Sequence, residues 1–368
     1  MVLAAKVWMM GNLTSRKHKI ESVQLLRAVA ALGVVVFHAL HQLMGRGGPE
    51  IHSAVLGAAG VDLFFVVSGF IMWVTALDPG MSPQRFAAKR IQRIVPLYWL
   101  MTLLVLAVAV LAPAAMRNAS HDPWHFVASF AFVPWPHPAM PQHLWPALVP
   151  GWSLNYEMFF YVLVGGSLLL KRSFRIPFIG GVLAAIVLAG LVFAPGGIAG
   201  FYANPIVLEF VLGLLIGMAF DHGHRTSRLD YTACVGGLVT FVLIGQWETE
   251  ANRLLTWGLP LALAAYGAIN ISLPRANPVV RVLEIIGDAS YSIYLTQFLA
   301  LPAATVVFAR ALPKLDGLLT CTAFVVGTSS VAVLVGIATF YWVEKPMLRA
   351  SNEIFSRNQR ARRAVAEW

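Results

Sequence analysis

Long apolar runs recur along the whole chain, and they constrain its fold more than any other feature. The sequence has 368 residues, of which 58% are hydrophobic and 12% are charged. A helix needs about 20 mainly apolar residues to cross the roughly 30 Å hydrocarbon core of a bilayer. The sequence therefore predicts an all-α polytopic membrane protein with no separate soluble domain. The ten predicted spans are 22–44, 57–77, 95–112, 150–170, 176–194, 204–220, 231–246, 254–273, 287–309 and 321–343.

The distribution of Lys and Arg predicts how these spans are oriented. With the N-terminus inside, the inner segments carry 21 of the 27 basic residues and the outer loops carry five. Basic residues are retained on the cytoplasmic side in short loops, so both termini are expected there. Merging or splitting the two weak spans, 231–246 and 254–273, would preserve this bias. We expect a cytoplasmic segment 1–21, a membrane domain 22–343 and a basic cytoplasmic tail 344–368. The net charge of +10 then suits anionic lipid better than nucleic acid.

Two ionisable residues share one face of the first predicted span. Arg27 and His38 are eleven positions apart, which brings them to nearly the same helical face about 16 Å apart along the axis. An ionisable side chain inside a membrane helix is costly and usually faces a cavity or a pathway. The spacing predicts a charged anchor near one surface and a reactive imidazole deeper in.

Three carboxylates fall at the depth of His38 in this topology. Asp62, Glu157 and Glu209 are all expected within roughly 7 to 11 Å of the outer edge of the membrane. A histidine held by a carboxylate can act as a general base, because the acid fixes the tautomer and stabilises the imidazolium. The alternative for each carboxylate is a buried hydrogen bond that joins two helices.

A basic cluster precedes the third predicted span. Arg90 and Arg93 share a helical face, and Arg85 and Lys89 add charge where the span enters the membrane. Guanidinium groups bind phosphate in a bidentate manner, so the cluster is suited to phosphates. The alternative is that these residues only enforce topology or touch lipid. Arg27, in the inner third of the first span, favours an anionic ligand.

The outer loop 113–149 and the two cysteines carry weaker signals. The loop combines seven prolines with three tryptophans and four histidines, and its aromatic faces suit sugar rings. Equally, tryptophan is enriched at membrane interfaces and proline stiffens loops. The histidines have irregular spacing and the cysteines lie in different spans, so we predict no metal site. The tryptophans and histidines of the loop and the two cysteines of the chain are Trp124, Trp135, Trp145, His121, His125, His137, His143, Cys234 and Cys321.

Six segments in order identify a family resemblance across nearly the whole chain. They are Arg27 with ten residues before His38, AAGVDLFFVVSGFIMW (58–73), KRIQRIVPLYW (89–99), PGWSLNYEMFFYV (150–162), IGDASYSIYL (286–295) and FYWVEKPMLR (340–349). Together they resemble the acyltransferase-3 family of integral membrane acyltransferases. WSLNYEMFFY is similar to the branch that contains exopolysaccharide-production acetyltransferases.

The resemblance implies an activity and a site. In such proteins an acyl-CoA, usually acetyl-CoA, binds from the cytoplasm as donor substrate, with no tightly bound cofactor. The acyl group reaches a glycan, which can be lipid-linked, at the outer side of the bacterial inner membrane. Carried over by motif, the donor site comprises Arg27, Arg90 and Arg93, which hold nucleotide phosphates or the pantetheine arm.

His38 is the implied catalytic residue, either as base toward a sugar hydroxyl or through a transient acyl-histidine. Asp62 and Glu157 are expected to orient His38 or to bind the acceptor, and Trp152 and Asn155 to bind substrate. Many relatives have a histidine where this chain has Gln297, so no base is expected there.

Two rival functions remain open on the sequence. A transporter or flippase for a polysaccharide intermediate would also place ionisable residues in a cavity, but no inverted repeat or pair of broken helices is apparent. A structural subunit of a polysaccharide assembly complex would leave the ionisable layer around His38 unexplained. We therefore predict an O-acyltransferase, which accounts for the ionisable residues around His38, and polysaccharide assembly machinery is an expected partner.

Overall fold

The computed structural model describes residues 2–77, 80–112, 122–220, 226–271, 277–312 and 314–353, with side chains from Glu21 onward. These residues are helices and connecting loops, and one isolated β-bridge joins His137 to Met140. The predicted all-α class is confirmed. His121, part of the segment 1–21 and most of the basic tail, 354–368, lie outside the described residues.

The helices follow one another in the order that the apolar runs predict. They are α1 (Val2–Met44), α2 (Gly60–Thr75), α3 (Pro83–Leu111), α4 (Pro123–Phe130), α5 (Gly151–Ser167), α6 (Arg172–Phe193), α7 (Gly197–Tyr202), α8 (Leu208–Phe220), α9 (Arg228–Ile244), α10 (Leu259–Asn270), α11 (Pro278–Asp288), α12 (Ser290–Ala311) and α13 (Leu318–Thr339). Short 3₁₀ helices span His52–Ala59, Pro205–Val207 and Gly245–Trp247, and π-helical turns span Leu254–Gly258 and Phe340–Glu344.

Each of the ten predicted spans falls on a helix. Among the described residues, seven helical segments are long and apolar enough to cross a membrane. The other three predicted spans fall on shorter helices: α5 with 17 residues, and the apolar segments Pro205–Phe220 and Leu254–Asn270. The small helix α4 was not predicted, although Asp122 caps the backbone N–H of Trp124 and Pro123 occupies the first turn.

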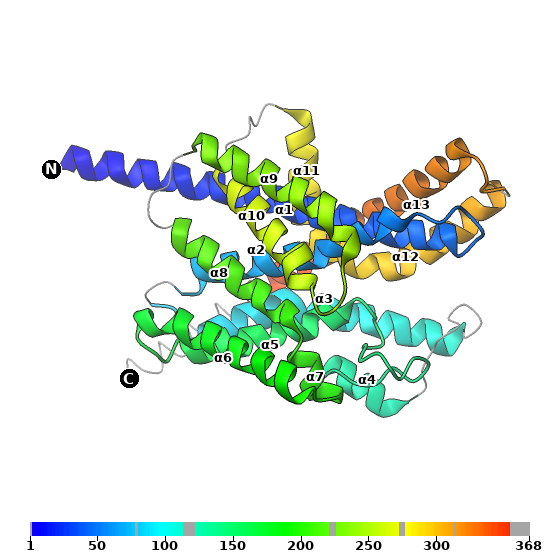
Figure 1. Ribbon diagram of the computed structural model, residues 1–368, viewed down its shortest axis with the longest axis horizontal. Coiled ribbons are helices and arrows are strands. Elements are labelled where there is room, and N and C mark those ends of the chain that lie inside the picture. Colours follow the sequence, from blue (N-terminus) through cyan, green and yellow to red (C-terminus); the bar gives the residue numbers. More distant parts are fainter. Residues whose placement is uncertain are drawn as a thin grey trace.

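Helix packing places α1 and α2 at the centre of the molecule. α1 contacts α2, α10, α11, α12 and α13, and α2 packs along α8. In Figure 1, α12 and α13 lie side by side at the right, α9 and α10 lie in the upper left part of the bundle, and α5 and α6 lie in the lower left part. The largest apolar core is built from α2, α3, α5, α6, α8 and α12.

Glycine allows the close approach of α2 and α8. A Cβ on Gly213 would collide with the backbone of Val66, and one on Gly217 would collide with Trp73. The GxxxG spacing in the sequence therefore serves helix packing, as expected for small residues four apart. Both cysteines are free, and neither belongs to a group of metal-ligating side chains among the described residues.

Two local features position charged side chains. α3 begins at Pro83, well before the predicted span 95–112, because Ser82 accepts a hydrogen bond from the backbone of Arg85 and Pro83 suits the first turn. The basic cluster therefore lies on a continuous helix. The π-helical turn Leu254–Gly258 follows Arg253, and the second π-helical turn ends at Glu344. Such turns occur frequently at functional sites.

Candidate functional site

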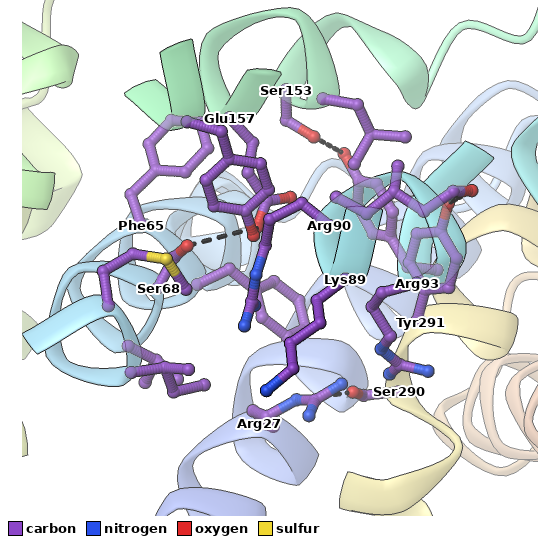
Figure 2. Close-up of a pocket in the computed structure, with 18 of the residues that line it drawn as sticks. Arg27, Phe65, Ser68, Lys89, Arg90, Arg93, Ser153, Glu157, Ser290 and Tyr291 are labelled. Carbon is purple, nitrogen blue, oxygen red and sulfur yellow. Dashed lines mark hydrogen bonds between the residues drawn. The ribbon is translucent and has the colours of Figure 1, made fainter. Parts of the chain in front are cut away.

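Four basic side chains line a cavity of about 470 Å³, which we call the arginine cavity. Arg27 enters it from α1, and Lys89, Arg90 and Arg93 enter it from α3. Figure 2 shows the nitrogen ends of Arg27, Lys89 and Arg90 converging on one space, with Arg93 at its edge. The structure thus brings together the three arginines that the sequence assigns to an anionic donor.

Two of these arginines are oriented by neighbouring helices. The Nε of Arg27 donates a hydrogen bond to the Oγ of Ser290 at 3.1 Å. The guanidinium carbon of Arg90 lies 5.6 Å from the ring centroids of both Phe86 and Tyr161, within the range of cation–π contacts. The buried Nε of Arg90 has no acceptor among the described residues. A buried donor without an acceptor is costly, so this position is suited to an oxygen of a bound anion.

Arg93 is held by an ion pair. Its guanidinium pairs with Glu344, and the Oγ of Ser292 donates to the second carboxylate oxygen of Glu344 at 2.5 Å. The ring of Tyr291 lies 5.4 Å from the guanidinium carbon of Arg93. Glu344 is 1% exposed and does not line the arginine cavity. It therefore acts on the cavity by fixing Arg93.

Glu157 lies in the arginine cavity and not beside His38. Its Oε1 accepts hydrogen bonds from Ser68 at 3.1 Å and from Tyr161 at 2.5 Å. His38 lines a second cavity, and Glu157 does not line that cavity. Glu157 and His38, which the sequence places at a similar depth, therefore face different cavities. Residues at equal depth share a site only if their helical faces meet, and depth alone does not fix the face.

The second cavity has a volume of about 1060 Å³, and we call it the histidine cavity. His38 lines it from α1 and is exposed to it. The ring of Phe37 packs edge-on against the His38 ring at 4.9 Å. His41 bonds the carbonyl of Phe37 through Nδ1 at 3.0 Å and does not line the cavity, so it is a neighbour of the site.

Aromatic side chains form one wall of the histidine cavity. The ring of His143 stacks on that of Trp145 with centroids 4.0 Å apart and planes 6° apart, and Trp152 packs edge-on against Tyr156. All four line the cavity. Part of the loop 113–149 thus lines the histidine cavity, and its aromatic rings are accessible from that cavity.

Histidines of this loop also hold its fold. His125 hydrogen-bonds the carbonyl of Trp145 through Nε2 at 2.9 Å, and its ring lies 5.2 Å from that of His137. Burial, together with the nearby His125 and His143, lowers the pKa of His137 below its ordinary value. These contacts fix the loop as one wall of the cavity.

Asp62 is bound by an arginine that the sequence analysis did not select. Arg253 donates from Nε and Nη2 to the two carboxylate oxygens of Asp62, at 2.8 and 2.7 Å. Asp62 is fully buried and lines neither cavity, whereas Arg253 lines the histidine cavity. Asp62 therefore does not orient His38 directly; it anchors Arg253 in the cavity wall.

The environment of Asp62 explains why an arginine is required. Glu209 is also fully buried, interacts electrostatically with Asp62, and shares Arg253 as its cationic neighbour. Glu248 lies 3.7 Å from Nη1 of Arg253, and the ring of Trp257 lies 4.6 Å from its guanidinium carbon. Buried carboxylates require a counter-cation. The buried carboxylates therefore indicated that a cation must lie nearby. The sequence did not indicate which arginine provides that cation.

The two predicted substrate-binding residues are placed differently. Trp152 lines the histidine cavity. Asn155 is 1% exposed, lines neither cavity, and has no hydrogen-bond partner for its side chain among the described residues. Gln297 lines the histidine cavity and donates from Nε2 to the carbonyl of Tyr294 at 3.2 Å. Trp152 is therefore accessible from the histidine cavity, whereas Asn155 is not accessible from either cavity.

A family model described as "Acyltransferase domain" matches residues 20–342. The chain is 37% identical to the exopolysaccharide production protein ExoZ of Rhizobium meliloti (strain 1021) over 86% of this chain and 94% of that protein. It is 25% identical to the acyltransferase MdmB of Streptomyces mycarofaciens over 77% and 79% of the two chains.

A putative O-acetyltransferase of Staphylococcus aureus (strain COL) is 24% identical over 74% of this chain and 49% of that protein. No solved structure matches the chain.

Proposed function

The chain belongs to the acyltransferase-3 family and is a membrane acyltransferase, and from that premise we propose its reaction. It moves an acyl group, most simply acetyl, from acyl-CoA to a hydroxyl of an exopolysaccharide or of its lipid-linked precursor. One observation carries the proposal: a cavity with four basic side chains lies next to a cavity that contains His38, and the two share lining residues.

The charge of the arginine cavity supports an acyl-CoA donor. Arg93 is neutralised by Glu344, but Arg27, Lys89 and Arg90 face the cavity with only Glu157 as an opposing charge among its lining residues. Coenzyme A carries several phosphate groups, and arginine binds phosphate oxygens through charge-assisted hydrogen bonds. We assign Arg27, Arg90 and Arg93 to donor binding, with Arg93 positioned by Glu344.

The histidine cavity supports a glycan acceptor. Its guanidinium, Arg253, is already paired with Asp62, and the carboxylate of Glu250 adds a negative charge to the lining. Such a lining disfavours an anionic ligand. Aromatic rings provide flat apolar faces beside the polar groups, an arrangement suited to a neutral sugar, and Trp152 is the candidate contact.

The proposed transfer conserves atoms and protons. A nitrogen of His38 accepts the proton of a sugar hydroxyl while the hydroxyl oxygen attacks the thioester carbon. The new C–O bond forms, the C–S bond breaks, and the proton passes from His38 to the thiolate to give CoA-SH. General-base catalysis of this kind contributes about 10²- to 10⁴-fold in rate. A transient acyl-histidine would use the same residue as nucleophile.

The proposed topology follows the distribution of basic residues. Ten spans with both termini in the cytoplasm would put the arginine cavity on the inner side of a bacterial plasma membrane and the histidine cavity on the outer side. Arg27 lines the inner cavity and His38 the outer one, on a single helix. The donor would bind where acyl-CoA is made, and the acceptor where polysaccharide is assembled.

Mass spectrometry of exopolysaccharide tests the proposal. A strain lacking the protein is complemented with wild type, His38→Ala or His41→Ala, and the amount of each protein in the membrane is matched. We expect O-acyl groups with wild type and with His41→Ala, and their loss in the deletion and with His38→Ala. The control is matched because His41 lies one turn further along α1 and lines neither cavity. Unchanged acylation with polymer retained inside the cell would favour a transporter and refute the proposal.

A further inference from the structure

The arginine cavity and the histidine cavity meet at two side chains. Val61 of α2 and Tyr294 of α12 line both cavities, and no other described residue does. Both are nearly closed to solvent, with exposed fractions of 6% for Val61 and 7% for Tyr294. These two buried side chains therefore form the boundary between the cavities.

The lining residues of the two cavities follow one another along α12. On α12, Ser290 and Tyr291 line the arginine cavity, Tyr294 lines both, and Gln297 and Phe298 line the histidine cavity. The cavities are thus stacked end to end along this helix.

The segment from Ala58 to Phe64 runs in the reverse order. Ala58, in the 3₁₀ helix His52–Ala59, lines the histidine cavity, whereas in α2 Val61 lines both cavities and Phe64 lines the arginine cavity. The same two cavities therefore succeed each other along a second segment, and the boundary falls at one residue on each.

Hydrogen bonds fix the position of Tyr294. Its hydroxyl donates to the carbonyl of Pro150 at 2.9 Å and lies 2.8 Å from the Oγ of Ser153. Its ring packs edge-on against Phe64 with centroids 6.0 Å apart. Pro150 and Ser153 lie at the start of α5, so Tyr294 joins α12 to α5 at the boundary between the cavities. A ring held at both its edge and its hydroxyl cannot move aside without breaking these contacts.

We propose that Val61 and Tyr294 form a constriction through which the donor presents its acyl group to His38, and that Tyr294 determines which acyl lengths are transferred. This inference rests on the proposed function, because it assumes a donor in the arginine cavity and an acceptor in the histidine cavity. A short acyl group passes the fixed ring, whereas each added methylene must fit beside it. The same ring separates the thioester from water in the histidine cavity.

Acyl-chain selectivity tests the constriction. Membranes containing wild type, Tyr294→Ala, Val61→Ala or Phe298→Ala are supplied with de-acylated exopolysaccharide and with acetyl-, propionyl-, butyryl- or hexanoyl-CoA. Because one methylene in an apolar pocket is worth about 10- to 200-fold in selectivity, we expect Tyr294→Ala to raise the butyryl-to-acetyl ratio by about 10-fold or more. Val61→Ala is expected to raise it by less. Phe298→Ala, on the same helix but in the histidine cavity only, is expected to leave this ratio unchanged.

Hydrolysis of acyl-CoA without acceptor gives a second readout. Opening the constriction is expected to increase the release of free carboxylic acid and CoA-SH by Tyr294→Ala relative to wild type. If Tyr294→Ala does not accumulate in the membrane, Val61→Ala carries the test alone. Ratios in the folded variants within about twofold of wild type would overturn the inference while leaving the proposed function intact. Failure of wild type to transfer any acyl group from CoA would refute the proposed function instead.

Discussion

Removing the guanidinium of Arg253 is expected to destabilise the protein strongly. In the Arg253→Met variant, the fully buried Asp62 loses hydrogen bonds of 2.8 and 2.7 Å and remains beside the equally buried Glu209. Breaking a buried ion pair by removing one partner costs about 3–5 kcal/mol, because an uncompensated charge is left behind. That cost corresponds to a decrease of about 10²- to 10⁴-fold in the ratio of folded to unfolded protein.

The assay is equilibrium unfolding of purified protein in mixed micelles, with a double-mutant cycle. Arg46→Met is the matched control, because Arg46 is an exposed arginine in the turn after α1, and it is expected to change the free energy of unfolding by at most about 0.5 kcal/mol. Asp62→Asn alone should cost less than Arg253→Met, since Arg253 keeps Glu209 and Glu248 as anionic neighbours.

The double variant Asp62→Asn with Arg253→Met decides whether the pair acts as a unit. It is expected to be more stable than the sum of the single changes implies, by at least about 1 kcal/mol. Strict additivity of the two changes, or a cost of Arg253→Met no larger than that of Arg46→Met, would refute the reasoning.

Three further predictions concern the two cavities and the loop. Arg90→Gln should raise the KM for acetyl-CoA by about 10- to 100-fold in steady-state kinetics, since a hydrogen bond to a charged group contributes about 1.5–3 kcal/mol; Arg85→Gln, on the same helix but outside the cavity, should not. Trp152→Ala should raise the KM for the glycan with little effect on the KM for the donor, and the reverse pattern would count against its assignment. Burial lowers the pKa of His137, so the unfolded loop binds a proton more readily and the stability of the loop is complete above about pH 6.5. The protection factors of residues 122–150, which correct the hydrogen-exchange rates for the intrinsic pH dependence of exchange, should therefore decrease as the pH falls below that value, and His137→Gln should weaken this decrease.

The sequence predicted the elements of the fold better than their contacts. Apolar runs located a helix at every predicted span, because the hydrocarbon core imposes a length on each crossing. The pairing of Arg27 with the basic cluster of α3 was also accessible, since charge inside a membrane helix must face a cavity or a partner.

The orientation of each helix about its own axis could not be predicted from the sequence in the same way. His38, Asp62 and Glu157 occupy similar predicted depths, yet they face the histidine cavity, Arg253 and the arginine cavity respectively. Rotation is set by packing such as the contact of Gly213 with α2, which a single sequence does not reveal. The same limit applies to Asn155, which the resemblance assigns to substrate and which is buried and lines neither cavity.

The two ion pairs, Arg93 with Glu344 and Arg253 with Asp62, join residues far apart in the sequence, and the sequence indicated their members unequally well. Glu344 lies in the motif FYWVEKPMLR, but its pairing with Arg93 spans 251 positions of the chain. Arg253 was counted only as an outer-loop charge. The excess of buried carboxylates predicted that some cation must reach them, and the fold was needed to identify which one.

Transfer of labelled acetyl from acetyl-CoA to de-acylated exopolysaccharide, measured in membranes containing equal amounts of wild type, His38→Ala or His41→Ala, tests the central claim most directly. The account predicts that wild type and His41→Ala label the glycan at equal rates, with one CoA-SH released for each acetyl group transferred. His38→Ala should still bind acetyl-CoA, because the arginine cavity is intact, but should transfer label at least about 10²-fold more slowly. Label incorporation by His38→Ala at the wild-type rate would contradict the assignment of the catalytic base. Absence of label with wild type, alongside intact acetyl-CoA, would contradict the proposed reaction itself.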